Sequence, residues 1–192
     1  PFHGDLSVFP SFRDMPLVVR HPRERREELR KRLGIDSSRP VVLLSFGGFD
    51  LERIPWNRIS ELQDYQFVYF RSPVSADNVL YVPNGTMPHV DIVRCADIVL
   101  SKPGYGICAE CICTQTPMVY TDRGEFLEYE YLVAGLQRHG RSLYIPQEEL
   151  LSGNWRPWLD QAQQLPPVKE PLPADGAKRV AETIEDFLLP AR

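Results

Sequence analysis

Six short apolar runs, separated by turns or by segments of helical pattern, constrain the fold of this chain more than any other feature. Runs this short and this apolar are typical of strands that are buried on both faces of a sheet. Strands that alternate with helices at short separations require a parallel sheet with helices on both faces. The predicted strands are residues 41–45, 67–70, 79–82, 98–100, 117–121 and 143–145.

We therefore predict an α/β, Rossmann-like, doubly wound fold with a mainly parallel six-stranded sheet in the order 3-2-1-4-5-6. Residues 1–20 contain scattered prolines and are predicted to be a linker or interdomain segment, and residues 21–192 are predicted to form one domain. Because the chain begins at Pro1 without methionine, we expect a fragment of a longer protein. Helices are expected at residues 23–32, 54–63, 87–96, from 107 onward, 125–138, in pieces within 146–165, and at 176–189.

Charge and cysteine usage exclude several classes of function. The formal net charge is −4 and no basic patch is dense, which argues against a nucleic-acid partner. No apolar run approaches the length of a membrane span. The four cysteines have no zinc-site spacing and are expected to be buried, reduced and free of metal, in a reducing cytoplasm. They are Cys95, Cys108, Cys111 and Cys113.

The stretch from Cys95 to Glu110 reads as a strand, a glycine-rich turn and a helix. Its turn, residues 101–106, contains a serine, a lysine and two glycines, and glycine lets a ligand approach the backbone closely. The helix that follows presents unpaired N–H groups and partial positive charge, which suit a diphosphate. Glu110, about one turn further, can accept hydrogen bonds from ribose hydroxyls. The alternative is an ordinary strand-to-helix turn with a capping serine.

Three further loops are predicted to lie at the same edge of the sheet as this turn. In a parallel sheet the carboxyl ends of the strands meet at one edge, where ligands bind. This places Gly47, Gly48, Thr86 and the loop 121–125 beside the turn. The glycine pair after the first strand is not a complete G-x-G-x-x-G motif, so a dinucleotide site is only weakly supported. His89 is expected to be a structural residue at a pocket wall.

These motifs together resemble a known family. Residues 40–145 are similar to the carboxy-terminal, donor-binding half of a GT-B glycosyltransferase, and in particular to the N-acetylglucosaminyltransferase family of peptidoglycan synthesis. The matching features are Gly47-Gly48, an Ala-Asp pair within 91–97, the glycine turn and glutamate within 101–110, and the proline, strand and acidic helix within 117–140. The whole chain is still more similar to the glycosyltransferase-like region that precedes the sugar kinase in plant L-arabinokinase.

The resemblance implies that the domain binds a UDP-sugar without a metal or other cofactor. Glu110 then binds the uridine ribose, the backbone at Thr86 meets the uracil ring, and the turn holds the diphosphate. Glu125 and Glu128 stand where the family has amide side chains against the donor sugar. The expected donor-nucleotide residues are Gly47, Gly48, Thr86, Ser101, Lys102, Gly104, Tyr105, Gly106 and Glu110, and the expected donor-sugar residues are Glu125, Phe126 and Glu128.

Two functions from different classes remain open at this point. One is the donor-binding domain of a glycosyltransferase, whose catalytic base would lie in a missing amino-terminal half, so that this fragment alone is inactive. The other is a degenerate, non-catalytic module that binds sugar nucleotides or regulates a linked sugar kinase. The presence of Glu110 favours the first. The carboxylates at Glu125 and Glu128 favour the second, because they can accept but not donate hydrogen bonds.

Overall fold

The computed structural model describes residues 2–47, 54–70, 76–169 and 171–188 of the 192-residue chain. Within these residues six strands form one sheet in the order β3-β2-β1-β4-β5-β6, and every neighbouring pair is parallel. This confirms the predicted fold class and strand order. The strands are β1 (Val41–Ser45), β2 (Gln66–Tyr69), β3 (Val79–Tyr81), β4 (Ile98–Ser101), β5 (Met118–Tyr120) and β6 (Ser142–Tyr144).

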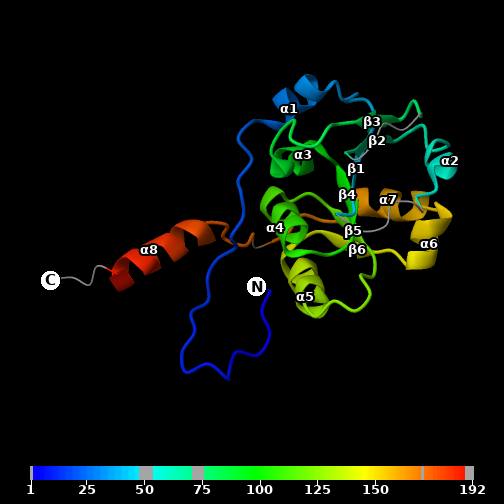
Figure 1. The fold of residues 1–192 in the computed structure, drawn as a ribbon. Helices are drawn as coiled ribbons and strands as arrows, with labels where there is room; N and C mark the ends of the chain where they lie inside the picture. Colours follow the sequence, from blue (N-terminus) through cyan, green and yellow to red (C-terminus); the bar gives the residue numbers. More distant parts are fainter. Residues whose placement is uncertain (1, 48–53, 71–75, 170, 189–192) are drawn as a thin grey trace.

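Helices cover both faces of this sheet (Figure 1). The core cluster on one face includes residues of α1, α3, α4 and α5, and the cluster on the other includes residues of α2, α6 and α7. The helices are α1 (Arg26–Leu33), α2 (Trp56–Ile59), α3 (His89–Cys95), α4 (Tyr105–Thr114), α5 (Tyr129–His139), α6 (Gln147–Ser152), α7 (Arg156–Gln163) and α8 (Gly176–Leu188).

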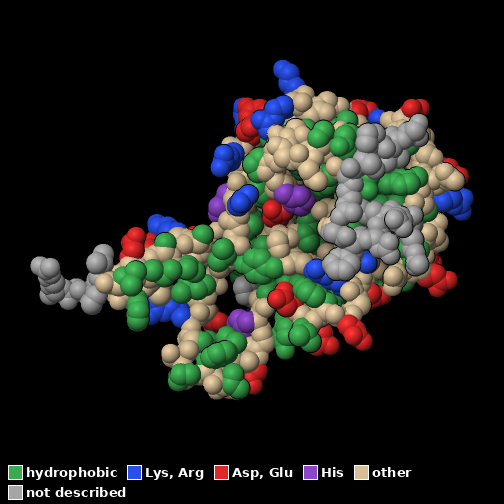
Figure 2. Space-filling view, viewed as in Figure 1, with side chains coloured by type: hydrophobic (Ala, Val, Ile, Leu, Met, Phe, Trp, Pro, Cys, Tyr) green, Lys and Arg blue, Asp and Glu red, His purple; other side chains and the backbone are tan. Residues whose placement is uncertain are grey.

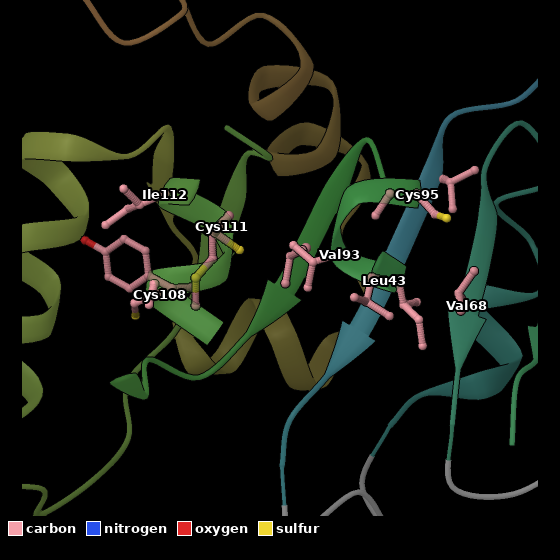
Figure 3. Packing of buried hydrophobic residues seen from close by; sticks show 14 of the residues in the cluster. Leu43, Val68, Val93, Cys95, Cys108, Cys111 and Ile112 are labelled. Atoms are coloured by element: carbon pink, nitrogen blue, oxygen red, sulfur yellow. The ribbon is translucent and has the colours of Figure 1, made fainter. Parts of the chain in front are cut away.

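The central strand β1 supplies side chains to both clusters. Side chains alternate between the faces of a strand, so Val41 and Leu43 point to one cluster while Val42 and Leu44 point to the other. Figure 3 shows Leu43 and Val68 of the sheet facing the helices that cover the first cluster. A strand that is buried on both faces must be apolar along its whole length, which is why 41–44 contains no polar residue.

Several predicted helix boundaries were wrong. The helix predicted at 125–138 begins only at Tyr129, because Gly124 adopts a left-handed φ of 71° and the residues after it form turns. The helix predicted at 54–63 is limited to Trp56–Ile59, and α4 begins at Tyr105 rather than Ile107. Propensity alone does not mark these ends, since turn geometry and packing decide them.

The segment before α1 and the segment before α8 cross beside the domain. The backbone N–H of Leu17 donates to the carbonyl of Pro173 (3.0 Å), and that of Gly176 donates to the carbonyl of Leu17 (3.1 Å). Leu17 is fully buried in the first core cluster. Beyond this crossing, α8 projects away from the sheet, and the amino-terminal segment forms an extended loop (Figure 1). None of the helices in the described part of the chain combines the length and apolarity that crossing a bilayer requires.

Candidate functional site

The carboxyl ends of β1 and β4 lie side by side and form the floor of the candidate site. Ser45 pairs with Ser101 in the parallel register, and the Ser101 hydroxyl donates to the Ser45 carbonyl. Two cavities, of about 190 and 270 Å³, share residues 45–47 as a common wall. Ser101 is 1% exposed, so its hydroxyl serves mainly to join the two strand ends.

The smaller cavity lies at the amino end of α4. Gly104 is the N-cap residue, with an extended backbone (φ −149°, ψ 155°), and no side chain in the described residues caps this helix. The first N–H groups of α4, from Tyr105, Gly106 and Ile107, are the donors that a helix start leaves unpaired. This uncapped helix start, the end of β1 and Lys102 surround one cavity. The arrangement suits an anion.

Arg123 adds a second cation to this cavity. Its Nη1 donates to the carbonyl of Pro103 (2.5 Å), and its guanidinium lies 3.8 Å from the centre of the Phe126 ring. A Cβ atom on Gly104 would lie 2.8 Å from Arg123 Nη1, so a larger residue at this position would require the guanidinium to shift. The sequence analysis did not identify Arg123. The sequence feature that could have identified Arg123 is its position in the loop 121–125, which was predicted to lie at this edge of the sheet.

Two side chains that line the larger cavity, Ser45 and His89, belong to a hydrogen-bonded chain that continues behind His89 to Glu110. Ser45 Oγ lies 3.1 Å from His89 Nε2, and His89 Nδ1 lies 2.5 Å from Glu110 Oε2. The imidazole is 39% exposed and the carboxylate 15%, so His89 is the more accessible of the two. If Nδ1–H donates to the Glu110 carboxylate, then Nε2 of the neutral ring accepts a hydrogen bond from the Ser45 hydroxyl.

Aromatic and amide groups complete the wall of the larger cavity. Tyr69, Phe70 and Asn84 line it together with His89, and the Phe70 and His89 ring centres are 5.5 Å apart. Flat rings beside an amide are suited to holding a planar base by stacking and hydrogen bonding. Thr86, which was predicted here, turns its hydroxyl onto the Pro83 carbonyl (2.6 Å).

The remaining predicted residues are placed as follows. Gly47, with a left-handed φ of 66°, lines both cavities, and Gly48 lies outside the described residues. The Tyr105 hydroxyl bonds the backbone of Val18, so only the backbone of this residue faces the helix start. The structure thus brings together Gly47, Ser101, Lys102 and Gly104 around one cavity, and Glu110 reaches the second cavity through His89.

The loop between β5 and α5 carries the predicted sugar-binding residues. Glu125 and Glu128 are exposed and Phe126 is half-buried beneath Arg123. Asp122 anchors the loop by accepting hydrogen bonds from the hydroxyls of Tyr144 (2.7 Å) and Tyr129 (3.4 Å). Burial, with the Asp122 carboxylate nearby, raises the pKa of Tyr129 to about 12, so this phenol stays a donor.

Three of the four cysteines lie in the first core cluster, and none of the four lines the two site cavities. Cys95, Cys108 and Cys111 are buried, Cys113 is half-buried, and all four are unpaired. Figure 3 shows the first three among the apolar side chains of the first cluster. Burial raises the pKa of both Cys95 and Cys108 to about 11. Among the residues that the structure describes, no group of His, Cys, Asp or Glu is arranged to hold a metal ion.

Comparison with known proteins supports one fold. No protein-family model matches the chain. Its sequence is 31% identical over 176 residues to L-arabinokinase of Arabidopsis thaliana, which covers 88% of this chain but only 16% of that protein.

Several solved structures have a similar fold at low sequence identity. MurG of Acinetobacter baumannii aligns with a TM-score of 0.58 and 12% identity, over 93% of this chain and 57% of that one. The glycosyltransferase VinC in complex with dTDP aligns with a TM-score of 0.51 and 19% identity, over 89% and 40%. The chain therefore spans a sixth of its sequence relative and about half of these structures. It has the Rossmann-like fold of one half of a GT-B glycosyltransferase.

Proposed function

We propose that this chain is the donor-binding domain of a GT-B glycosyltransferase and holds the diphosphate of a UDP-sugar at the amino end of α4. The observation that carries the proposal is the smaller cavity, where two cations, Lys102 and Arg123, flank an uncapped helix start. No carboxylate lines this cavity in the described residues. Helix N–H groups and fixed cations stabilise a diphosphate, both when it is bound and when it leaves.

The nucleoside would extend from the diphosphate into the larger cavity. Tyr69, Phe70 and Asn84 then face the base, and the ribose lies near His89, behind which Glu110 is hydrogen-bonded. Glu110 Oε2 is bound to His89, while Oε1 has no partner among the residues that the structure describes. Glu110 can therefore contact a ribose hydroxyl with one oxygen while it orients His89 with the other. The dTDP complex of VinC supports a nucleoside diphosphate as the ligand class.

Transfer requires a partner surface that would supply the acceptor site and the catalytic base. The exposed apolar side chains of α8 include Ile184 (52%), Phe187 (84%) and Leu188 (67%), and those of the amino-terminal loop include Val8 (83%) and Phe12 (58%). Figure 2 shows hydrophobic side chains gathered on both segments. Exposed apolar surface of this kind indicates an interaction site. We assign it to the amino-terminal half of a GT-B enzyme, and expect the unpaired thiols to be kept reduced in the cytoplasm.

A second function is favoured by one specific feature. Glu125 and Glu128 are exposed carboxylates where a donor sugar would lie, so they can accept from sugar hydroxyls but cannot donate to them. The domain would then bind a sugar nucleotide without transferring the sugar, and would regulate a linked kinase like that of L-arabinokinase. Both functions require nucleotide binding, and only the first requires turnover in the full-length protein.

Calorimetric titration of UDP and UDP-GlcNAc into the chain tests the proposal, with Lys102→Ala and Arg123→Ala as variants. A hydrogen bond to a charged group contributes about 1.5–3 kcal/mol, so each variant should weaken UDP binding by about 10-fold or more. Arg20 is exposed and outside both cavities, so Arg20→Ala should bind UDP like the parent. A parent that binds no nucleotide, or cavity variants that bind like the parent, would exclude the proposed site.

A further inference from the structure

A third cavity, of about 310 Å³, lies at the opposite edge of the sheet from the nucleotide site. Asp97 and Pro117, which line it, precede β4 and β5, whereas Ser101 and the loop 121–125 follow these strands. The cavity is therefore separate from the two described above. Its lining residues include Arg26, Arg94, Asp97, Gln115, Arg141 and Gln163.

Asp97 is the single carboxylate that lines this cavity in the described residues, and its oxygens are already engaged. Oδ1 bonds Arg26, while Oδ2 bonds Arg30 Nη2 (2.7 Å) and accepts the backbone N–H of Val41 (2.7 Å). One carboxylate thus faces two guanidinium groups of α1. The other two arginines that line the cavity form no hydrogen bond or ion pair with Asp97.

Arg94 and Arg141 are these remaining cations. Arg94, in the last turn of α3, has no hydrogen bond or ion pair with any residue that the structure describes. Arg141 donates only to backbone carbonyls, those of Leu165 (2.5 Å) and Gln115 (3.4 Å), and its buried Nε has no partner in the described residues. A half-buried guanidinium that lacks a counter-ion carries a desolvation cost, which lowers its pKa. An anion in the cavity would relieve that cost.

The segment that brings these groups together is held in an unusual conformation. Gln115 has a left-handed φ of 57°, which is uncommon for a residue other than glycine. This turn ends α4 and directs the Gln115 carbonyl to Arg141. The hydroxyls of Thr114 and Thr116 bond each other (2.8 Å), and Thr114 also bonds the Glu110 carbonyl (2.8 Å). These neutral groups are satisfied internally, so recognition falls to the arginines.

We propose that this cavity is a binding site for a small phosphate ester, with Arg94 and Arg141 as the groups that bind the phosphate. Guanidinium groups bind phosphate oxygens with two parallel hydrogen bonds, and arginine is the residue best suited to this geometry. A volume of about 310 Å³ is at the low end of small-molecule sites, which suits a phosphorylated monosaccharide rather than a nucleotide sugar. The inference does not depend on the proposed nucleotide site.

Calorimetry with glucose 1-phosphate and inorganic phosphate, and with glucose as the uncharged control, tests this proposal. Arg94→Gln removes a cation that has no structural partner in the described residues, so the variant should keep the melting temperature of the parent. It should weaken glucose 1-phosphate binding by about 10-fold or more. Arg94→Lys keeps the charge but loses the paired donors, so its affinity for glucose 1-phosphate should lie between those of the parent and Arg94→Gln. Arg20→Gln should change the affinity by less than about twofold.

UDP titration of the same variants separates this site from the nucleotide site. Arg94→Gln should bind UDP like the parent, whatever the outcome for the proposed function, because the two sites lie at opposite edges of the sheet. The proposal is overturned if neither phosphate compound binds below about 10 mM. It is also overturned if Arg94→Gln leaves glucose 1-phosphate binding unchanged, or if UDP displaces glucose 1-phosphate competitively.

Discussion

At the residue scale, Glu110 can act in two ways, by binding the ribose directly or by orienting His89, and variants distinguish the two roles. One carboxylate oxygen lies 2.5 Å from His89, and we propose that the other contacts a ribose hydroxyl. If Glu110 binds the ribose directly, Glu110→Ala should weaken UDP binding by about 10- to 150-fold, which corresponds to one hydrogen bond to a charged group. Glu110→Gln keeps the shape and should lose only part of this affinity.

His89→Ala is the matched variant for this test, with UDP affinity and melting temperature measured for each protein. If Glu110 acts only by orienting the imidazole, His89→Ala should reproduce the full loss seen in Glu110→Ala. A direct ribose contact instead predicts a smaller loss for His89→Ala. An unchanged UDP affinity in a folded Glu110→Ala protein would contradict both roles.

The strands are the elements that could be predicted well from sequence. Continuous apolar runs such as 41–44 have few alternatives to a doubly buried strand, and the order of a doubly wound sheet then follows from short right-handed connections. Helix ends were predicted less well. The start of α5 depends on the left-handed turn at Gly124 and on the contact between Arg123 and Phe126, which no periodicity indicates.

The positions of the loops around the candidate site could be predicted from the sequence, whereas the directions of their side chains could not. The loops that follow the strands could be assigned to one edge, which placed Gly47, Lys102 and Gly104 together. Which side chains turn into the cavities depends on tertiary contacts. The predicted side chain of Tyr105 lies outside the cavity because its hydroxyl donates to the Val18 carbonyl. Arg123, which was not predicted, lies beside Gly104 and lines the smaller cavity.

The buried thiols of α3 and α4 should make the stability of the domain depend on pH. Burial raises the pKa of Cys95 and Cys108 to about 11, above the unfolded value of about 8.5. Between these values the unfolded chain binds fewer protons than the folded one, so the free energy of unfolding should fall as the pH rises. The stabilising contribution of these two thiols is fully present below about pH 8.5 and is lost as the pH rises towards 11.

Urea unfolding at a series of pH values measures this effect. Other groups titrate in the same range, so the informative quantity is the difference between the parent and Cys108→Ala. The variant should be less stable at pH 7, because it loses buried volume, and should depend less steeply on alkaline pH. Equal slopes for the two proteins would show that the Cys108 thiol does not contribute.

At the scale of the whole molecule, the domain has the fold of one half of a GT-B glycosyltransferase, and we propose that it forms one side of a cleft. The chain spans 57% of the MurG structure and 16% of L-arabinokinase, and its exposed apolar side chains on α8 have no cover in the described structure. We therefore expect this chain alone to release no UDP from UDP-sugars, even where it binds them. Release of UDP, measured with and without an acceptor sugar, checks this expectation, and robust transfer by the isolated chain would contradict it.

The central claim is that a nucleoside diphosphate binds at the amino end of α4, and amide chemical shifts report both binding and its place. UDP titrated into ¹⁵N-labelled protein should shift the backbone N–H signals of Gly104, Tyr105, Gly106 and Ile107 most strongly, together with those near Lys102. The same titration with uridine should leave these signals close to their starting positions, because the diphosphate is absent. If UDP produces no shifts, or shifts amides at other sites while those at the start of α4 stay unchanged, the account is wrong.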